Sequence, residues 1–299
     1  MYWDRAWKLV EGCTKVSAGC ENCWSEQETF MRCGHPNAVV SERARVVLDS
    51  TGFYGHITCR HDNLDLPLRV KKPTVFAVWN DLFHEGVTES FRNHAYNIMC
   101  RCRQHTFLVL TKRHRTMWDH LFRNGEQDTH EMIRDHIWHG VTVEDQQRAD
   151  ERIPLLLRVP GKRFISIEPM LGSISFSFGT CKNCGGRGWI DTGELDQMLC
   201  LCNLNGATKS HGVSSLVYLH AVLLGGESGK NARPMHPDWT RSVRDQCTEA
   251  GVPFFFKQWG EWIETDDAKL QSFGKMARVG KRRAGRLLDG RTHDDLPWS

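Results

Sequence analysis

Short apolar runs alternate with amphipathic helical patterns along most of the chain. Six such runs end in polar residues: TVFAVW before Asn80 and Asp81, TFLVL before Thr111 and Lys112, IWHGVTV before Glu144, RFISI before Glu168, AVLLGG before Glu227 and Ser228, and VPFFF before Lys257. Alternating strands and helices predict βα units with parallel strands. We therefore expect an α/β fold, a partial TIM-like βα barrel whose strand ends meet at one mouth. A doubly wound open sheet would also gather these ends.

Two of the intervening helices can be placed from their apolar spacing. Between residues 145 and 159 apolar residues recur at three- and four-residue steps, and Pro154 is expected to bend or restart this helix. A second helix is expected from Pro237 to a stop at Gly251. Its apolar stripe includes Cys247, which we interpret as a core residue.

Three cysteines lie close together near the start of the chain, in the run GCTKVSAGCENCW. Cys13, Cys20 and Cys23 can supply three sulfurs to one soft metal centre and leave a fourth coordination position open. Iron–sulfur clusters normally have four thiolate ligands, so three suggest an iron kept free for a small molecule. The alternative is a zinc knuckle completed by a histidine or by a further cysteine such as Cys33.

A second group of cysteines interrupts the βα rhythm. Cys181 and Cys184 form a CxxC followed by GGRG, and Cys200 and Cys202 form a CxC further on. Two close pairs predict a tetrahedral four-thiolate site, for which we favour structural Zn²⁺ over an auxiliary iron–sulfur cluster. We expect residues 172–218 to be an inserted cysteine-rich zinc module, residues 1–171 and 219–262 to be the barrel core with its N-terminal cluster loop, and residues 263–299 to be a basic tail.

Composition narrows the cellular setting. The 299 residues include no apolar run of 18 residues and no signal-peptide pattern at the start, so we expect a cytoplasmic protein with no membrane partner. Most of the twelve cysteines fall into two tight clusters, which favours metal ligation over disulfides. The net charge of +3 is small. The basic residues of the tail are either a solvated face or a contact with phosphates.

Seven separated blocks resemble one known family. They are the GCTKVSAGCENCW start, NDLFHEGV, TFLVLTKR, GVTVEDQQRADERIPLLL, ISIEPMLG, LLGGESGKNARPMHPDW and GVPFFFKQWGEW. Together they are similar to a phage- and prophage-borne three-cysteine family that looks like a divergent branch of the radical S-adenosylmethionine superfamily. The similarity extends from about residue 3 to the C-terminal tail.

The resemblance implies a cofactor and a reaction class. It implies a [4Fe–4S] cluster on Cys13, Cys20 and Cys23, S-adenosylmethionine on the open iron, and reductive cleavage to a 5′-deoxyadenosyl radical. An external electron donor such as flavodoxin or ferredoxin, and the host cytoplasm as location, are implied with it. The sequence departs from the superfamily in two places. Six residues separate Cys13 from Cys20 where three are usual, and Asn80 and Asp81 stand where a glycine-rich motif is expected.

The strand ends supply the remaining site predictions. From their position we expect Glu144, Glu168 and Lys257 to be catalytic, and we expect the cofactor to contact Asn80, Asp81, Thr111, Lys112, Glu227 and Ser228. The phage resemblance suggests nucleic-acid base hypermodification, namely an isomerase-like rearrangement or a carbon–carbon bond step on a modified thymidine in DNA. The alternatives are a zinc-stabilised, non-catalytic nucleic-acid-binding protein, or radical chemistry on a free nucleotide or peptide.

Overall fold

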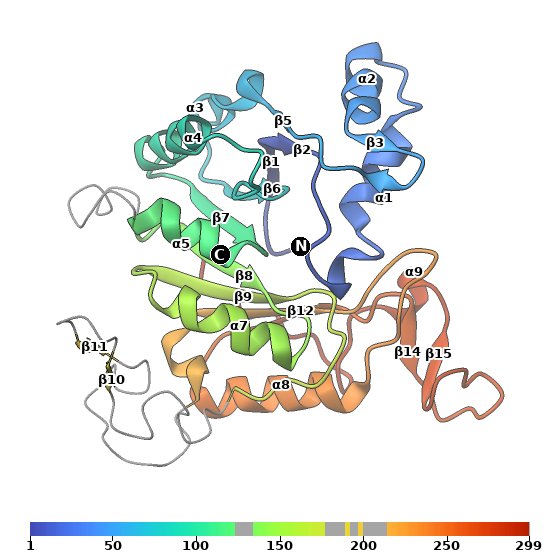
Figure 1. The fold of residues 1–299 in the computed structure, drawn as a ribbon. Helices are drawn as coiled ribbons and strands as arrows, with labels where there is room; N and C mark the ends of the chain where they lie inside the picture. The colour runs from blue at the N-terminus through green and yellow to red at the C-terminus, as the bar shows by residue number, and fades with distance from the viewer. Residues whose placement is uncertain (123–133, 177–188, 192–196, 200–213, 299) are drawn as a thin grey trace.

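Seven parallel strands form one curled sheet in the computed structural model, which describes residues 1–122, 134–176, 189–191, 197–199 and 214–298. The strands, in spatial order, are β1 (Arg5–Lys8), β6 (Val75–Trp79), β7 (Thr106–Thr111), β8 (Ile137–Thr142), β9 (Lys162–Ile167), β12 (Ala221–Gly225) and β13 (Phe254–Gln258). The spatial order equals the chain order, as in a barrel, whereas a doubly wound sheet reverses direction partway. The result is a half-barrel (Figure 1).

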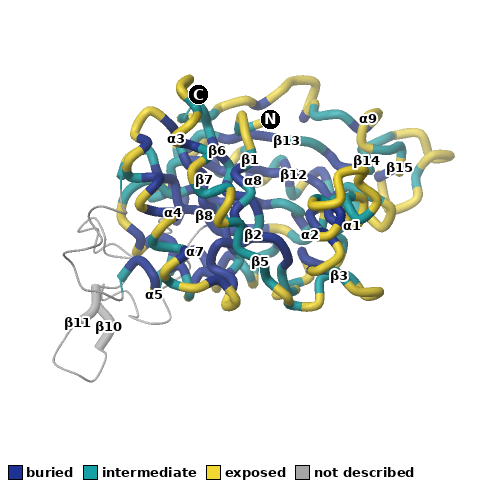
Figure 2. Tube along the Cα trace, turned by 90° about the horizontal axis from the view of Figure 1, so that it is seen from above, coloured by how far each residue is buried: buried dark blue, intermediate teal, exposed yellow. Residues whose placement is uncertain are grey.

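The two faces of this sheet have different partners. On β7, Phe107 and Val109 pack with the helices, whereas Leu108 belongs to a second apolar cluster with Phe164 and Phe255 on the inner face. The helices that contribute to the outer core are α4 (Glu89–Arg101), α5 (His114–Phe122), α7 (Gln146–Leu157) and α8 (Pro237–Ala250). Figure 2 shows the strands buried at the centre of the molecule. Alternation along each strand therefore separates a helix-covered face from a concave face.

The predicted elements can now be compared with the observed ones. All six predicted strands are confirmed, with ends shifted by one or two residues. The four-residue β1, RAWK, was not predicted because two of its residues are charged. The first predicted helix runs through Pro154 as one element, so of the expected bend or restart the restart does not occur. Gly251, at φ 67°, ends α8 as predicted, and Cys247 is fully buried in the core.

Between β1 and β6 the chain makes a long excursion that carries the three cysteines. Its elements are β2 (Val10–Glu11), η1 (Ala18–Cys20), α1 (Trp24–Arg32), α2 (Ala38–Val46), β3 (Leu48–Asp49), β4 (Gly52–Phe53), β5 (Thr58–Cys59), η2 (His61–Asn63) and α3 (Leu66–Arg69). Antiparallel pairing of β2 with β5 joins the beginning of this segment to its later part. In the inserted segment the structure describes the antiparallel pair β10 (Trp189–Asp191) and β11 (Gln197–Leu199). Cys181, Cys184, Cys200 and Cys202 lie outside the described residues.

The C-terminal residues are folded onto the half-barrel. After η4 (Ser215–Tyr218), β12, α8 and β13 come the hairpin of β14 (Trp262–Glu264) and β15 (Met276–Arg278) and the short α9 (Lys281–Ala284). Trp298 packs edge-on against Trp138 at 4.7 Å between ring centroids, and its indole N–H donates to the Tyr2 carbonyl at 2.9 Å. The segment predicted as a basic tail therefore covers part of the concave face. Among the described residues, no helix has both the length and the apolar character needed to cross a bilayer.

Candidate active site at the mouth of the half-barrel

One cavity of about 460 Å³ collects nearly all the predicted site residues. All three N-terminal cysteines line it. The strand-end residues that line it as predicted are Asn80, Asp81, Thr111, Lys112, Glu168, Glu227, Ser228 and Lys257. Glu144 lies behind this lining, fully buried. The carboxyl ends of the strands thus form a single mouth over which the cysteine loop is placed.

The local structure of the cysteine loop brings the three thiols to this mouth. Cys20 ends the 3-10 turn η1, Cys23 is the N-cap residue of α1, and Cys13 follows β2. All three are free thiols and are at least partly buried. Cys33 does not line the cavity, and its thiol donates to the Thr29 carbonyl at 3.7 Å. The geometry therefore gives no support to Cys33 as a fourth ligand.

Arg113 fastens the first part of the loop. Its guanidinium pairs with Asp81 at 3.0 Å and donates to the Thr14 hydroxyl at 2.5 Å. The same group lies 3.8 Å from the Cys13 sulfur. Asp81 also accepts from the Thr111 hydroxyl at 2.6 Å, so the ends of β6 and β7 act together. Predicted as cofactor contacts, Asp81 and Thr111 are tied here to the cysteine loop.

Glu144, which is buried beneath the cavity lining, holds the middle of the cysteine loop in place. Its carboxylate accepts from the Ser17 hydroxyl at 2.5 Å and pairs with Arg152 at 3.0 Å and Lys112 at 3.4 Å. A Cβ added to Gly19 would lie 2.5 Å from the same carboxylate, so only glycine permits this approach. Glu144, which was predicted to be catalytic, is placed here as a loop anchor.

Glu227 fastens the far side of the loop. Arg233 binds its carboxylate with two nitrogens, at 2.7 and 2.9 Å, in the bidentate geometry that suits guanidinium and carboxylate. Arg233 also donates to the Ala18 carbonyl at 2.8 Å, and the Asn22 amide donates to Glu227 at 3.0 Å. The GGES turn that contains Glu227 is therefore linked to the loop on both sides of Cys20.

Asn80 has a structural position as well. It adopts φ 59°, its carbonyl oxygen accepts from the Ser25 hydroxyl at 2.5 Å, and its amide donates to the Val10 carbonyl at 2.9 Å. Asparagine tolerates this left-handed conformation better than most residues. The end of β6 is thus joined to both β2 and α1, which flank the cysteine loop.

The three thiols differ in their electrostatic surroundings. Burial, together with the charge of Asp81, raises the pKa of Cys13 to about 12. Burial also raises the pKa of Cys23. At Cys20, burial is outweighed by the nearby Lys112 ammonium and by hydrogen bonds from the loop, and the pKa is lowered. A metal centre would favour the thiolate form of all three, because coordination replaces the proton.

Several residues that hold this site were missed by the sequence analysis. Arg113, Arg152 and Arg233 carry the loop-fixing ion pairs. Arg113 stands at the end of a predicted strand but was not selected as a site residue, and no strand-end or cysteine-spacing rule selects Arg152 or Arg233. Arg113 had a weak signal, because it directly follows the predicted Lys112. Arg152 lies inside a helix whose apolar stripe was read as core, and nothing in the local sequence marks its carboxylate partner.

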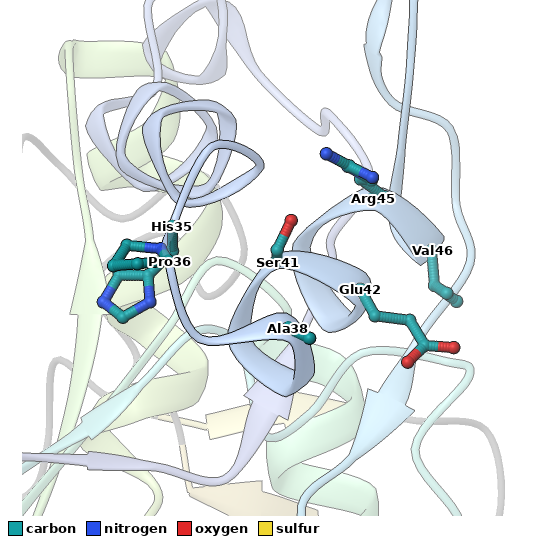
Figure 3. Close-up of a pocket in the computed structure, with 7 residues that line it drawn as sticks. All are labelled: His35, Pro36, Ala38, Ser41, Glu42, Arg45 and Val46. Carbon is teal, nitrogen blue, oxygen red and sulfur yellow. The ribbon is translucent and has the colours of Figure 1, made fainter.

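A second hollow lies away from the strand ends, beside α2. Its lining consists of His35, Pro36, Ala38, Ser41, Glu42, Arg45 and Val46. Figure 3 shows the charged side chains of Glu42 and Arg45 pointing in different directions from the helix. This second hollow contains none of the predicted site residues, although its volume of about 600 Å³ is larger than the 460 Å³ of the cavity that holds the cysteines. We assign the site to the cavity that holds the cysteines because its functional groups converge.

Comparison with known proteins gives one match. A family model described as a protein of unknown function, DUF5131, matches residues 1–297. No curated protein and no solved structure matches the chain.

Proposed function

The chain belongs to the DUF5131 family, whose function is unknown, and we propose that it is a radical S-adenosylmethionine enzyme acting in nucleic-acid base hypermodification. One observation carries this proposal: three free cysteines and the ends of the parallel strands line the same cavity at the mouth of a half-barrel. In barrel enzymes this face is where cofactors and reacting groups are placed.

The donor set fits a [4Fe–4S] cluster with one open iron. Cys13, Cys20 and Cys23 line the cavity, and no other cysteine of the described residues does so. The described part of the chain contains no group of three His, Cys, Asp or Glu side chains arranged to hold a single metal ion. That result concerns single ions, whereas the proposed group is a cluster in which each thiolate binds its own iron. When bound, it supplies the electron that cleaves S-adenosylmethionine.

The chain's own residues prepare the site in two ways. Lys112 lies near Cys20 and Arg113 lies near Cys13, and their positive charges offset the negative charge that three thiolates bring. Leu108, Leu110 and Phe164 line the inner part of the cavity. Such apolar walls limit water, which protects a reactive intermediate from side reactions.

The charge distribution supports a phosphate-bearing substrate. Glu144 and Glu227 are both compensated by arginines, so they do not present free negative charge at the mouth. Lys281 is exposed and also lines the cavity, and Arg282 and Arg283, which are exposed as well, follow it in α9. We propose a modified thymidine in DNA as the substrate, with a rearrangement or a carbon–carbon bond step as the reaction. A non-catalytic zinc protein would leave the cavity at the strand ends without a role.

The test is S-adenosylmethionine cleavage by anaerobically reconstituted protein reduced with dithionite. We expect 5′-deoxyadenosine and methionine from the wild type and from a Cys33→Ser control, and none from Cys23→Ser. Production that is equal in Cys23→Ser and wild type, or absent from an iron-loaded wild type with and without a thymidine-containing oligonucleotide, would contradict the proposal.

A further inference from the structure

Two unpartnered polar atoms lie in the inner half of the cavity. Ser166 is 1% exposed, and its hydroxyl makes no hydrogen bond within the described residues. The Oε1 atom of Glu168 is likewise buried and without a partner in the part of the chain described. Both residues line the cavity. Buried polar atoms in proteins nearly always have partners, so these two call for a ligand that supplies them.

Strand geometry explains why these two groups stand together with Lys257. Ser166 and Glu168 are two residues apart, at the end of β9, so both face the concave side. Lys257 comes from β13, two strands away, and its ammonium lies 2.6 Å from Oε2 of Glu168. Between them lies Gly225 of β12, where an added Cβ would be 3.5 Å from both side chains. The ion pair therefore lies beside the end of β12, at Gly225.

Apolar and aromatic side chains surround Ser166, Glu168 and Lys257. Leu108, Phe164 and Tyr2 line the same cavity, and the Lys257 ammonium lies 5.5 Å from the centre of the Tyr2 ring. Tyr2 and Phe164 are both held by ring contacts, with Phe255 and Trp298 respectively. Aromatic walls with a few converging polar atoms are typical of pockets for planar ring ligands.

The donors and acceptors of these three groups then point to a ligand edge. The Glu168 carboxylate only accepts, whereas the Ser166 hydroxyl and the Lys257 ammonium, which line the same cavity, can donate. The complementary edge has a central N–H between two carbonyl oxygens, which is the edge of a cyclic imide such as thymine or uracil. Cytosine lacks the central N–H, and adenine carries an unprotonated ring nitrogen there.

We propose that Ser166, Glu168 and Lys257 form a subsite that binds the imide edge of a pyrimidine base. The assignment rests on the proposed function only in naming this base as the part of the substrate presented to the cofactor. Ser166 was not among the residues selected from the sequence, and its role here is to bind and orient the ring.

Equilibrium binding tests this without turnover. Thymidine 5′-monophosphate is compared with its N3-methyl analogue and with cytidine 5′-monophosphate, using anaerobically prepared wild-type protein. We expect the N3-methyl and cytidine compounds to bind at least about tenfold more weakly, since each loses the central hydrogen bond to a buried carboxylate. Equal binding of all three compounds, tighter binding of an adenosine nucleotide, or no binding of thymidine 5′-monophosphate would overturn the assignment.

Two variants separate recognition from folding. Ser166→Ala should weaken thymidine 5′-monophosphate binding about tenfold and leave thermal stability unchanged, because its hydroxyl has no protein partner to lose. Glu168→Gln should reduce the preference over the N3-methyl compound. Ser215→Ala, which removes a buried hydroxyl outside the cavity, is the matched control.

Unchanged binding and unchanged preference in both variants would refute the subsite. The iron content of each preparation is measured alongside. A protein that binds thymidine 5′-monophosphate selectively but holds no iron would contradict the proposed function and leave the subsite standing. An iron-loaded protein that does not bind thymidine 5′-monophosphate selectively would contradict the subsite and leave the proposed function standing.

Discussion

Strand-end carboxylates hold the cysteine loop in this protein. The sequence predicted that Glu144 and Glu227 lie at the mouth, because each follows an apolar strand. It could not predict their partners, Arg152 and Arg233, because pairing depends on how helix and turn pack after folding. An ion pair fully enclosed by protein is costly to break on one side, since the remaining charge is left buried. These residues therefore position the loop that carries the three cysteines, and Glu227 also lines the cavity.

Gly19 is the residue at which this positioning can be tested. In Gly19→Ala the new methyl would lie 2.5 Å from the Glu144 carboxylate, which Arg152 and Ser17 hold in place. Overpacking of this kind costs about 1–3 kcal/mol. We expect lower stability in urea unfolding and weaker retention of iron.

Gly34→Ala is the matched control for this substitution. The nearest atom to its new methyl is the Met31 carbonyl oxygen at 3.9 Å, so stability and iron content should stay at wild-type values. If the two variants behaved alike, the Glu144 contact would not constrain the loop.

Among the elements, the strands were predictable because their apolar runs are continuous and end in polar residues. β1 was not predictable, because in this edge strand only Trp7 is fully buried and the sequence also includes Arg5 and Lys8. α7 continues through Pro154, where the sequence allowed either a bend or a restart, because packing of its apolar stripe overrides the local preference. Single-element rules do not include this tertiary contribution.

β8 carries a buried histidine that makes stability depend on pH. His139 is fully buried beside the Tyr96 hydroxyl at 2.9 Å, and burial, with a smaller effect of His120, lowers its pKa to about 3. In the unfolded chain the pKa is about 6.5. The unfolded state therefore binds a proton first as the pH falls, and stability is lost below about pH 6.5 at about 1.4 kcal/mol per pH unit.

Urea unfolding at pH 7 and pH 5 measures this effect. We expect the His139→Gln variant to lose about 2 kcal/mol less than the wild type between these values, because its amide does not titrate. Equal losses would show that His139 is protonated in the native state or plays no part in the pH dependence.

The inserted segment gives a prediction from the sequence alone. Because Cys181, Cys184, Cys200 and Cys202 have the spacing of one four-thiolate site, Cys184→Ser should release zinc and lower stability or solubility. Iron bound by the N-terminal cysteines should be unchanged. Metal analysis of the purified variant would contradict this if zinc stayed and iron were lost.

At the scale of the whole molecule, the chain order of the strands accounts for the site. Each βα unit adds a strand to the same edge, so all carboxyl ends point to one mouth, and this much followed from the sequence. The packing of the two ends of the chain against each other did not follow from the sequence. Contacts of Tyr2 with Trp298 join residues from the two ends of the chain, and no local pattern encodes such a pairing.

The position of α9 at the mouth predicts where a nucleic acid binds. Lys281, Arg282 and Arg283 are exposed and have no ion pair within the described residues. Replacing all three with alanine should weaken oligonucleotide binding and lower the slope of log affinity against log salt by about 2.

A control variant removes equal charge at the other end of the strands. Arg69, Lys71 and Lys72 are exposed on the segment that leads into β6, so their replacement should leave binding and its salt dependence nearly unchanged. Equal weakening in both triple variants would indicate unspecific electrostatic attraction. If binding were not weakened in the α9 variant, the basic residues of α9 would be a solvated surface that does not contact the nucleic acid.

The most direct test of the central claim is the iron content of anaerobically reconstituted protein. We predict a brown protein with about four irons per chain bound by Cys13, Cys20 and Cys23. Each single cysteine-to-serine replacement among the three should remove these irons, whereas Cys33→Ser and Cys247→Ser should retain them. A colourless protein that holds only zinc, or iron that persists when all three cysteines are replaced, would contradict the account.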